Sequence, residues 1–487
     1  MRIIITSLTL LLFVFSLQAQ DNKSNREAFL KQKQQEKQQY MDSLRQNFDE
    51  YRRRANEEYA QFMRQRWEEF QAMKGEPTPD IPGPPKPFKR EDETPIPGLP
   101  MKLGKVTPKP TPIEPLKRPE APVIPNVPTM PTFVFSYYGT PLTVHLDNSL
   151  KIKLDGISEN AVADAWIQLV SETSEVLLED CLSLRDELSL GDWAYHCLLR
   201  KLAEQYLGKN TNEAVVMETF MLAQSGYMVR IARKDNRLVL LMPFDGVVYE
   251  MSYLHIDGNR YVILDQERGG SLRVFNHSFA DNERVFSLRM AETPKLAMRA
   301  STPRSFTSQR YSDLSVTLST NQNLMDFYND YPHCDCAYYS WAGLSGEVKA
   351  KLYPMLRKGI EGKSQIEAAN RIINFVQTAF DYMTDGDQFG YERSFFADES
   401  FFYPHNDCED RAILFSILVQ ELLGLDVVLL HYPRHMATAV NFTEEVNGSY
   451  FNMDGKKWFV SDPTYIGANV GECMPQFRNT SPEVHKL

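Results

Sequence analysis

Three residues in the last part of the chain have side chains that together can perform nucleophilic catalysis. Cys408 precedes an apolar helical pattern, His435 opens a strand-like run, and Asp462 ends another strand-like run. A thiol becomes a strong nucleophile when a base removes its proton, and an imidazole serves as that base when a carboxylate fixes its tautomer and stabilises the imidazolium. The three residue types in this order predict acyl transfer from an amide, through a thioester on Cys408.

The helix that must position the cysteine is evident from the spacing of apolar residues. They recur at helical intervals after Cys408, Gly424 is a suitable stop, and the Asn406–Asp407 pair can cap the start. Cys408 would then lie in the first turn, where free backbone N–H groups and the helix dipole favour a thiolate. Glu409 and Asp410 act in the opposite direction, because nearby negative charge raises the pKa of a thiol. A base is therefore needed to activate this thiol.

The motifs around these residues resemble those of the transglutaminase-like superfamily, whose core has a papain-like fold. The matching segments are Asp407–Asp410, His435 with the small residues that follow it, and Asp462–Thr464. Asn406 departs from the pattern, since many relatives have a glycine there, and this leaves the shape of the turn before the cysteine open. The resemblance implies an α+β domain in which a helix carries the nucleophile and packs on an antiparallel sheet that carries the histidine and the aspartate.

The resemblance also implies a function, with Cys408, His435 and Asp462 as the catalytic triad. We expect an exported cysteine peptidase or amidase that acts on a protein or peptide substrate. An amine acceptor in place of water would make the chain a protein-glutamine transglutaminase. A non-catalytic binding or assembly protein that keeps the fold is the alternative from a different class.

An internal repeat divides the globular part of the chain. Residues 249–265 parallel residues 448–462: in both, an Asp-Gly hairpin turn joins two strand-like runs, and a closing aspartate follows eight residues after the turn aspartate. We therefore expect two tandem transglutaminase-like copies, residues 133–300 and 301–487, of which the second is catalytic.

The apolar helix and strand before this hairpin also repeat, at an offset of 198 residues. That offset places Arg237 opposite His435 and Asn210 opposite Cys408. The first copy would thus lack the nucleophile and the base but keep Asp265, and an ion pair with Arg237 is the expected fate of this aspartate. We expect the first copy to be a packing or recognition domain without catalytic activity.

A helix farther upstream repeats at an offset of only 175 residues, so the second copy has 23 extra residues just before its cysteine. They lie within Thr384–Asp407 and are rich in aromatic residues, which suggests a substrate wall that governs substrate choice, or alternatively a buried cover over the helix. This loop supplies the candidate substrate-binding residues. Gln388 and Tyr403 are candidates for a side-chain donor to the oxyanion beside the Cys408 backbone N–H, and His405 lies near enough in the chain to shape the site.

A second group of reactive residue types is the run His333-Cys334-Asp335-Cys336. Cys-x-Cys spacing is poor for one tetrahedral ion, and the sequence shows no second pair of ligands, so we expect neither a metal nor a cofactor. In an exported protein these cysteines would form a disulfide, with Cys473 as one candidate partner, or would simply be buried.

The chain before the repeat has three parts. Residues 1–19 have the charged start, apolar run and small-residue cleavage site of a signal peptide, so we expect a periplasmic or secreted protein without an integral membrane segment. Residues 20–74 lack glycine and proline and carry an aromatic stripe at helical spacing. They predict a long polar helix, which is either a coiled coil for self-association or partner binding, or a solvated spacer.

Residues 75–132 hold 18 of the 29 prolines and predict an extended linker, without a fixed fold between residues 80 and 128. The formal net charge of −11 argues against a nucleic-acid partner, because such a partner requires a basic face.

Overall fold

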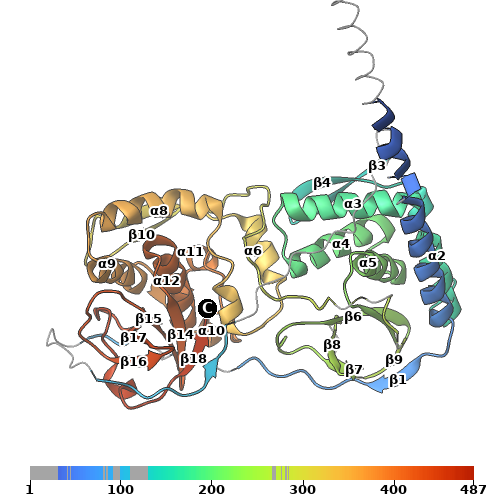
Figure 1. The fold of residues 1–487 in the computed structure, drawn as a ribbon. Helices are drawn as coiled ribbons and strands as arrows, with labels where there is room; N and C mark the ends of the chain where they lie inside the picture. The colour runs from blue at the N-terminus through green and yellow to red at the C-terminus, as the bar shows by residue number, and fades with distance from the viewer. Residues whose placement is uncertain are drawn as a thin grey trace, which may run out of the picture.

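Each copy of the predicted repeat begins with a β-hairpin, continues with helices and ends with a larger sheet (Figure 1). The predicted signal peptide, residues 1–19, lies outside the residues that the structure describes. The computed structural model describes residues 31–33, 35–40, 42–43, 45–79, 83, 86–90, 99–109, 130–265, 270–275, 277–279, 282 and 284–487.

In the first copy, helices separate an opening hairpin from the hairpins of the larger sheet. The elements in chain order are β3 (Thr132–Tyr137), β4 (Thr140–His145), η2 (Asn148–Leu150), α2 (Glu159–Leu169), α3 (Glu172–Glu187), α4 (Asp192–Leu207), α5 (Asn212–Gln224), β5 (Arg230–Lys234), β6 (Arg237–Pro243), β7 (Tyr253–Ile256), β8 (Asn259–Ile263) and β9 (Ser271–Val274).

The second copy follows the same plan with short additions before its last helix. The elements are β10 (Arg304–Thr307), β11 (Ser315–Leu318), α6 (Gln322–Asn329), α7 (Cys336–Tyr339), α8 (Gly346–Ile360), α9 (Gln365–Thr378), β12 (Asp381–Tyr382), α10 (Asp385–Gln388), α11 (Glu399–Phe402), β13 (His405–Asn406), α12 (Cys408–Leu423), β14 (Val427–Tyr432), β15 (His435–Val440), β16 (Tyr450–Met453), β17 (Lys456–Ser461), η3 (Pro475–Phe477) and β18 (Glu483–Lys486).

The larger sheets of the two copies have the same strand order, although the edge strand is antiparallel to its neighbour in the first and parallel in the second. Their strand orders are β1-β9-β5-β6-β8-β7 and, read from the matching edge, β2-β18-β14-β15-β17-β16. The edge strands β1 (Glu68–Gln71) and β2 (Val106–Thr107) come from the N-terminal segment. In each copy the helix that precedes the sheet, α5 or α12, packs on the second strand of the first hairpin, β6 or β15. The fold is therefore α+β, and the repeat is visible as a repeated order of elements.

The N-terminal helix is shorter than the predicted helix over residues 20–74. It ends at residue 63, and the chain then forms β1, which pairs antiparallel with β9. This segment leaves the helix because the open edge of β9 offers backbone groups that it can pair with. Tyr59 and Met63 are buried in the core of the first copy, and the rings of Tyr59 and Trp166 lie 4.8 Å apart. Part of the aromatic stripe thus serves packing within the chain, whereas Tyr51 and Phe62 of the stripe are exposed.

Parts of the proline-rich segment have a fixed structure, which corrects the prediction for residues 80–128. The backbone N–H of Met101 donates to the carbonyl oxygen of Tyr450 (2.7 Å), and β2 pairs parallel with β18. In Figure 1 the blue segment runs along the foot of both copies. Its prolines still exclude helix and central strand, but an edge position tolerates the flanking prolines, so the N-terminal segment can complete both sheets.

The two copies share one continuous apolar core. Between them, the backbone N–H of Tyr249 donates to the carbonyl oxygen of His333 (2.8 Å), and the indole of Trp193 donates to that of Asp330 (3.0 Å). Within the described part of the chain, no helix combines the length and the apolar character that a membrane crossing requires.

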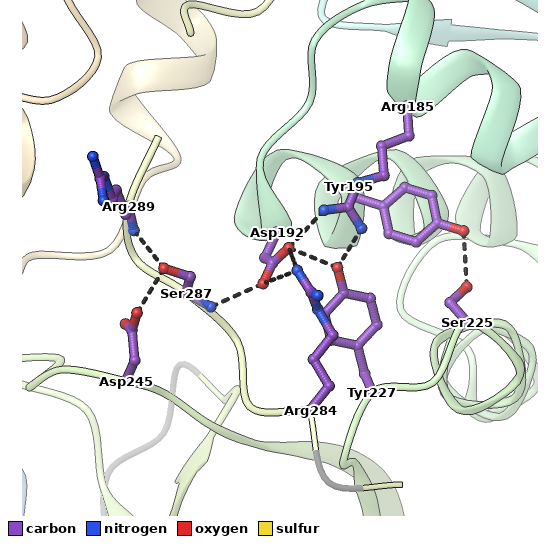
Figure 2. A network of polar contacts seen from close by, with 9 residues as sticks. All are labelled: Arg185, Asp192, Tyr195, Ser225, Tyr227, Asp245, Arg284, Ser287 and Arg289. Carbon is purple, nitrogen blue, oxygen red and sulfur yellow. Dashed lines mark hydrogen bonds and ion pairs between the residues drawn. The ribbon is translucent and has the colours of Figure 1, made fainter. Parts of the chain in front are cut away.

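A buried polar network ties the helices of the first copy to the segment that leads into the second (Figure 2). Asp192, at the start of α4, is 2% exposed. Its carboxylate accepts hydrogen bonds from Arg185 (2.7 Å), Tyr227 (2.7 Å), Arg284 (3.0 Å) and the backbone N–H of Ser287 (3.0 Å). Two guanidinium groups therefore donate to one buried carboxylate.

We predict that Asp192→Ala lowers the free energy of unfolding by roughly 3–5 kcal/mol, because it removes the carboxylate paired with the largely buried Arg185. The matched control is Asp326→Ala, which removes an exposed carboxylate paired with Arg299 at 2.6 Å. That change should cost at most about 1 kcal/mol. Urea unfolding of both variants checks this, and equal losses would contradict the role of the network.

Candidate functional site

The nucleophile candidate opens the most buried helix of the second copy. Cys408 is the first residue of α12, and Asp407 occupies the cap position with a carboxylate of Asp410 accepting its backbone N–H (3.2 Å). Gly424 ends the helix in the left-handed conformation (φ 66°), as the sequence predicted. The helix packs on β14 and β15, so its first turn meets the start of β15.

The expected base and orienter are in contact. His435 is the first residue of β15, and its Nε2 lies 2.8 Å from Oδ2 of Asp462. The other carboxylate oxygen accepts the backbone N–H groups of Thr464 (2.9 Å) and Tyr465 (3.2 Å). The ring of His435 stacks on Phe477 with centroids 5.1 Å apart. The imidazole is thus held in place by the Asp462 carboxylate and the Phe477 ring. Asp462 has the position that an orienting carboxylate needs.

The cysteine packs against Met436, the residue that follows His435. The backbone N–H of Met436 hydrogen-bonds the Cys408 sulfur, so the thiol lies against the chain at the position next to His435. Nδ1 of His435 is buried and makes no hydrogen bond with any described residue, Cys408 included. The free nitrogen is the one opposite the Asp462 contact, which is the nitrogen that a catalytic base would use.

The resting thiol is not the thiolate that the helix start alone predicted. Burial raises the pKa of Cys408 well above its ordinary value, and the charges of Glu409 and Asp407 raise it further. The thiol is fully buried, and its sulfur donates to Oε2 of Glu409 (3.2 Å). The hydrogen bond from Met436 lowers the pKa but is outweighed. Desolvation and nearby carboxylates therefore overcome the helix dipole in this state.

The N-terminal segment covers the thiol. A Cβ placed on Gly83 would lie 3.4 Å from the Cys408 sulfur and 2.5 Å from the hydroxyl oxygen of Tyr382, so a glycine allows this close approach. The Tyr382 hydroxyl is buried without a hydrogen bond to the described residues. Burial raises its pKa, and the neighbouring Cys408 adds to the effect, so the hydroxyl keeps its proton. The sequence did not predict a role for Tyr382.

Four carboxyl groups gather beside the nucleophile. One oxygen from each of Asp385, Glu392, Asp407 and Glu409 lies within 4.8 Å of the others. Burial raises the pKa of Asp385 to about 7 and holds the pKa values of Asp407 and Glu409 well above their ordinary range. Three of these groups are buried and cannot all be ionised so close together, so the cluster holds protons at neutral pH.

We predict that stability falls as the pH rises from 5 to 8. The folded protein keeps the Asp385 proton up to a pKa of about 7, whereas the unfolded chain releases it near 4, so this contribution to stability is lost as the pH rises through 7. Asp385→Asn, which cannot ionise, should reduce the fall. Chemical unfolding across this pH range checks the slope, with the exposed Asp387→Asn as control; an unchanged slope in Asp385→Asn would contradict it.

The extra loop, residues 384–407, is a buried cover over much of its length. Phe395, Phe396 and Phe401 are each at most 1% exposed, and Phe396 stacks on Tyr328 of α6 with ring centroids 4.3 Å apart. The expectation that this loop governs substrate choice without affecting folding is therefore not supported. Its aromatic rings gain more free energy by filling the core than a rim position would provide.

The predicted substrate-binding residues of this loop contact one another or α6. Gln388 Oε1 lies 3.1 Å from Nδ1 of His405, and its Nε2 donates to the His405 carbonyl oxygen (3.3 Å). The Tyr403 hydroxyl donates to Asn329 (3.1 Å). Among the described interactions, none joins these three residues to Cys408. Tyr382 lies on β12, where it pairs with Asn406 of β13. Burial raises the pKa of its hydroxyl, and Cys408 is close enough to raise it further. Tyr382 therefore replaces the three predicted residues as the candidate side-chain donor.

We predict that Phe396→Ala lowers the free energy of unfolding by roughly 3–5 kcal/mol, because it leaves a cavity among buried rings. Tyr391→Ala is the control, since Tyr391 is in the same loop and 48% exposed. Its change should stay within about 0.5 kcal/mol. Thermal and urea unfolding measure both, and a neutral Phe396→Ala would restore the view of a loop that is dispensable for folding.

In the first copy, the residue that corresponds to Cys408 is not Asn210, as the sequence offset predicted, but Asn212. Asn212, the first residue of α5, accepts the backbone N–H of Leu238 on its side-chain oxygen (2.7 Å). Leu238 is the second residue of β6, as Met436 is of β15. Asn212 is thus the counterpart of Cys408, and Asn210 lies before the helix with φ 58°. The sequence offset paired Cys408 with Asn210 because it was set by the strands. The starts of α5 and α12 are separated by a different number of residues than the starts of β6 and β15.

The predicted ion pair of the first copy is confirmed. Arg237 Nη2 lies 2.9 Å from Oδ2 of Asp265, and Lys234 Nζ approaches the same oxygen at 2.8 Å, which the sequence did not predict. Two cations occupy the place of one imidazole, and neither serves as a base while it is protonated beside a carboxylate.

The remaining cysteines form no disulfide; all six are free and buried. Cys336 packs with Cys408 on the sheet face covered by α12, whereas Cys473 packs with Tyr432 on the other face. The expected pairing with Cys473 is wrong because the sheet separates the two thiols, and the alternative of plain burial is confirmed.

Comparison with known proteins does not identify the chain: no protein-family model, no curated protein and no solved structure matches it.

Proposed function

We propose that the chain is an exported cysteine peptidase or amidase of the transglutaminase-like kind, with Cys408 as nucleophile, His435 as base and Asp462 as orienter. One observation carries the proposal. Asp462 holds Nε2 of a buried histidine at 2.8 Å, and the residue after that histidine contacts the sulfur of a cysteine at a helix start. A structural histidine needs no such arrangement of carboxylate, free nitrogen and thiol.

The chemistry follows from these positions. Nδ1 of His435 takes the thiol proton as the Cys408 sulfur attacks the amide carbonyl carbon. The backbone N–H of Cys408 and the hydroxyl of Tyr382 donate to the oxyanion. The imidazolium then protonates the leaving amine, and a thioester remains on Cys408. His435 next accepts a proton from water, whose oxygen attacks the thioester, and the carboxylic acid leaves as the thiol is restored.

Water is the acceptor that we favour, on the resemblance of a free-standing exported chain to the peptidase branch of the superfamily. An amine acceptor would instead give a protein-glutamine transglutaminase. Both routes share the thioester, so the acceptor changes only the second half of the reaction. Trapping of a labelled primary amine into a protein substrate would distinguish the two.

A second candidate is a binding or assembly protein that keeps the fold without activity. It is favoured by the burial of Cys408, which is 0% exposed, and by its raised pKa. Catalysis requires Gly83 to move away from the sulfur and the sulfur to lose its contact with Glu409. Thiol reactivity therefore separates the two candidates.

We predict that a small cysteine-directed electrophile labels Cys408 at least about tenfold faster than Cys181 and Cys197, because His435 can take the Cys408 proton once substrate-sized molecules enter. His435→Ala should slow this labelling. Peptide mapping by mass spectrometry measures all sites in one sample. Labelling of Cys408 no faster than that of Cys181 or Cys197 would refute the catalytic role.

The two copies supply matched aspartate variants for the same assay. Asp462→Ala should reduce peptide hydrolysis by up to about 10⁴-fold, since it removes the orienter of the imidazole. Asp265→Ala removes the corresponding aspartate of the first copy and should lower stability while leaving thioester formation intact. Equal losses of activity in both variants would contradict the assignment of the chemistry to the second copy.

A further inference from the structure

A cluster of nitrogen and oxygen donors lies on the second sheet, apart from the proposed triad. His431 on β14 is the cross-strand partner of Glu483 on β18, and His485 follows Glu483 by two residues. Residues two apart on a strand project to the same face, as do directly paired residues on neighbouring strands. All three side chains therefore occupy one face, and one donor atom from each lies within 4.8 Å of the other two.

His485 gives a second, independent indication of a ligand. It is 7% exposed, and neither of its ring nitrogens makes a hydrogen bond with a described residue. Its nearest ionic neighbour is Asp335, with Oδ1 3.6 Å from Nδ1, which is too long for a hydrogen bond. Buried imidazoles are normally satisfied, and an ion accounts for one that is not.

The surroundings provide room and donors. A cavity of about 60 Å³ is lined by His431 and His485, together with His333, Asp335 and Glu409. Asp335 belongs to the run His333–Cys336, in which the sequence showed ligand types without a second pair. The fold supplies that second pair, as the two histidines on β14 and β18.

We propose that His431, Glu483 and His485 bind a divalent transition-metal ion of the Zn²⁺ class, with Asp335 beside the site to orient His485. Two imidazoles and one carboxylate form a common three-ligand set for Zn²⁺ and leave one tetrahedral position for water. Atoms around such an ion lie roughly 3.3 Å apart, so the donors would close in on binding, and the partly exposed side chain of Glu483 has room to turn.

Two further features agree with this site. Burial lowers the pKa of His431, and the neighbouring His485 lowers it further, so the imidazole is neutral and able to bind an ion at pH 7. Glu483 also pairs with Lys105 at 3.2 Å, but the lysine side chain is 77% exposed, so this pair is weak and easily given up. A carboxylate near a metal-bound histidine typically fixes its orientation, which is the position of Asp335.

The test is calorimetric titration of Zn²⁺ into the untagged full chain after chelator treatment. We expect one ion per chain in the wild type. Loss of a direct ligand in His431→Ala or His485→Ala should weaken binding by more than the roughly 10–100-fold that loss of an outer partner costs. His255→Ala, an exposed histidine of β7 in the first copy, is the matched control and should bind like the wild type.

Several results would overturn the site. The first is no binding in the wild type, and the second is binding that survives in both histidine variants. The third is loss of binding in Asp385→Asn but not in the histidine variants, which would move the ion to the carboxylate cluster beside Cys408. Co²⁺ substitution in the wild type gives a readout that does not depend on any variant folding. A tetrahedral spectrum without sulfur charge transfer is expected, whereas an octahedral spectrum or a sulfur-to-cobalt band would assign different ligands.

Discussion

The docking of the first turn of α12 against the start of β15 is the contact on which the site depends. It sets Met436 against the Cys408 sulfur and so brings a helix-borne thiol to the strand residue that follows His435. The hairpin turn before β15, with Arg434 at φ 60°, and the turn after Asp462 then fix the histidine and its carboxylate. A shift of one residue along β15 would turn His435 to the other face of the sheet.

Charge around this contact is arranged to keep the thiol protonated at rest. The first turn of α12 brings carboxyl groups next to the sulfur, and the loop before it brings more. Arg411 is the compensating cation: its guanidinium donates to the carbonyl oxygens of Gln377 and Phe380 and stacks over Tyr382. Burial lowers the pKa of Arg411 to about 10 but leaves it charged at neutral pH.

The two copies show how one architecture carries different chemistry. The helix start, the first hairpin and the closing aspartate recur in both copies. The first residue of the helix contacts the backbone N–H of the second strand residue in each, as Asn212 in the first copy and Cys408 in the second. In the first copy the aspartate neutralises Lys234 and Arg237; in the second it orients an imidazole. The shared part is the backbone framework, which depends on apolar packing and hairpin turns, whereas the site depends on a few side chains that the framework presents.

The sequence by itself determined the α+β class, the repeated order of elements, the helix that starts at Cys408 and the Arg237–Asp265 pair, because apolar periodicity, Asp-Gly turns and local spacing are short-range signals. Tertiary structure decided what long-range contacts control. It turned the end of the predicted N-terminal helix into an edge strand, since the sheets offered unpaired edges. It buried the aromatic loop, placed Gly83 and Tyr382 at the thiol, and raised the pKa of Cys408 through desolvation. It also brought His431 and His485 to Asp335. Such proximities join segments far apart in the chain, and no periodicity within one segment encodes them.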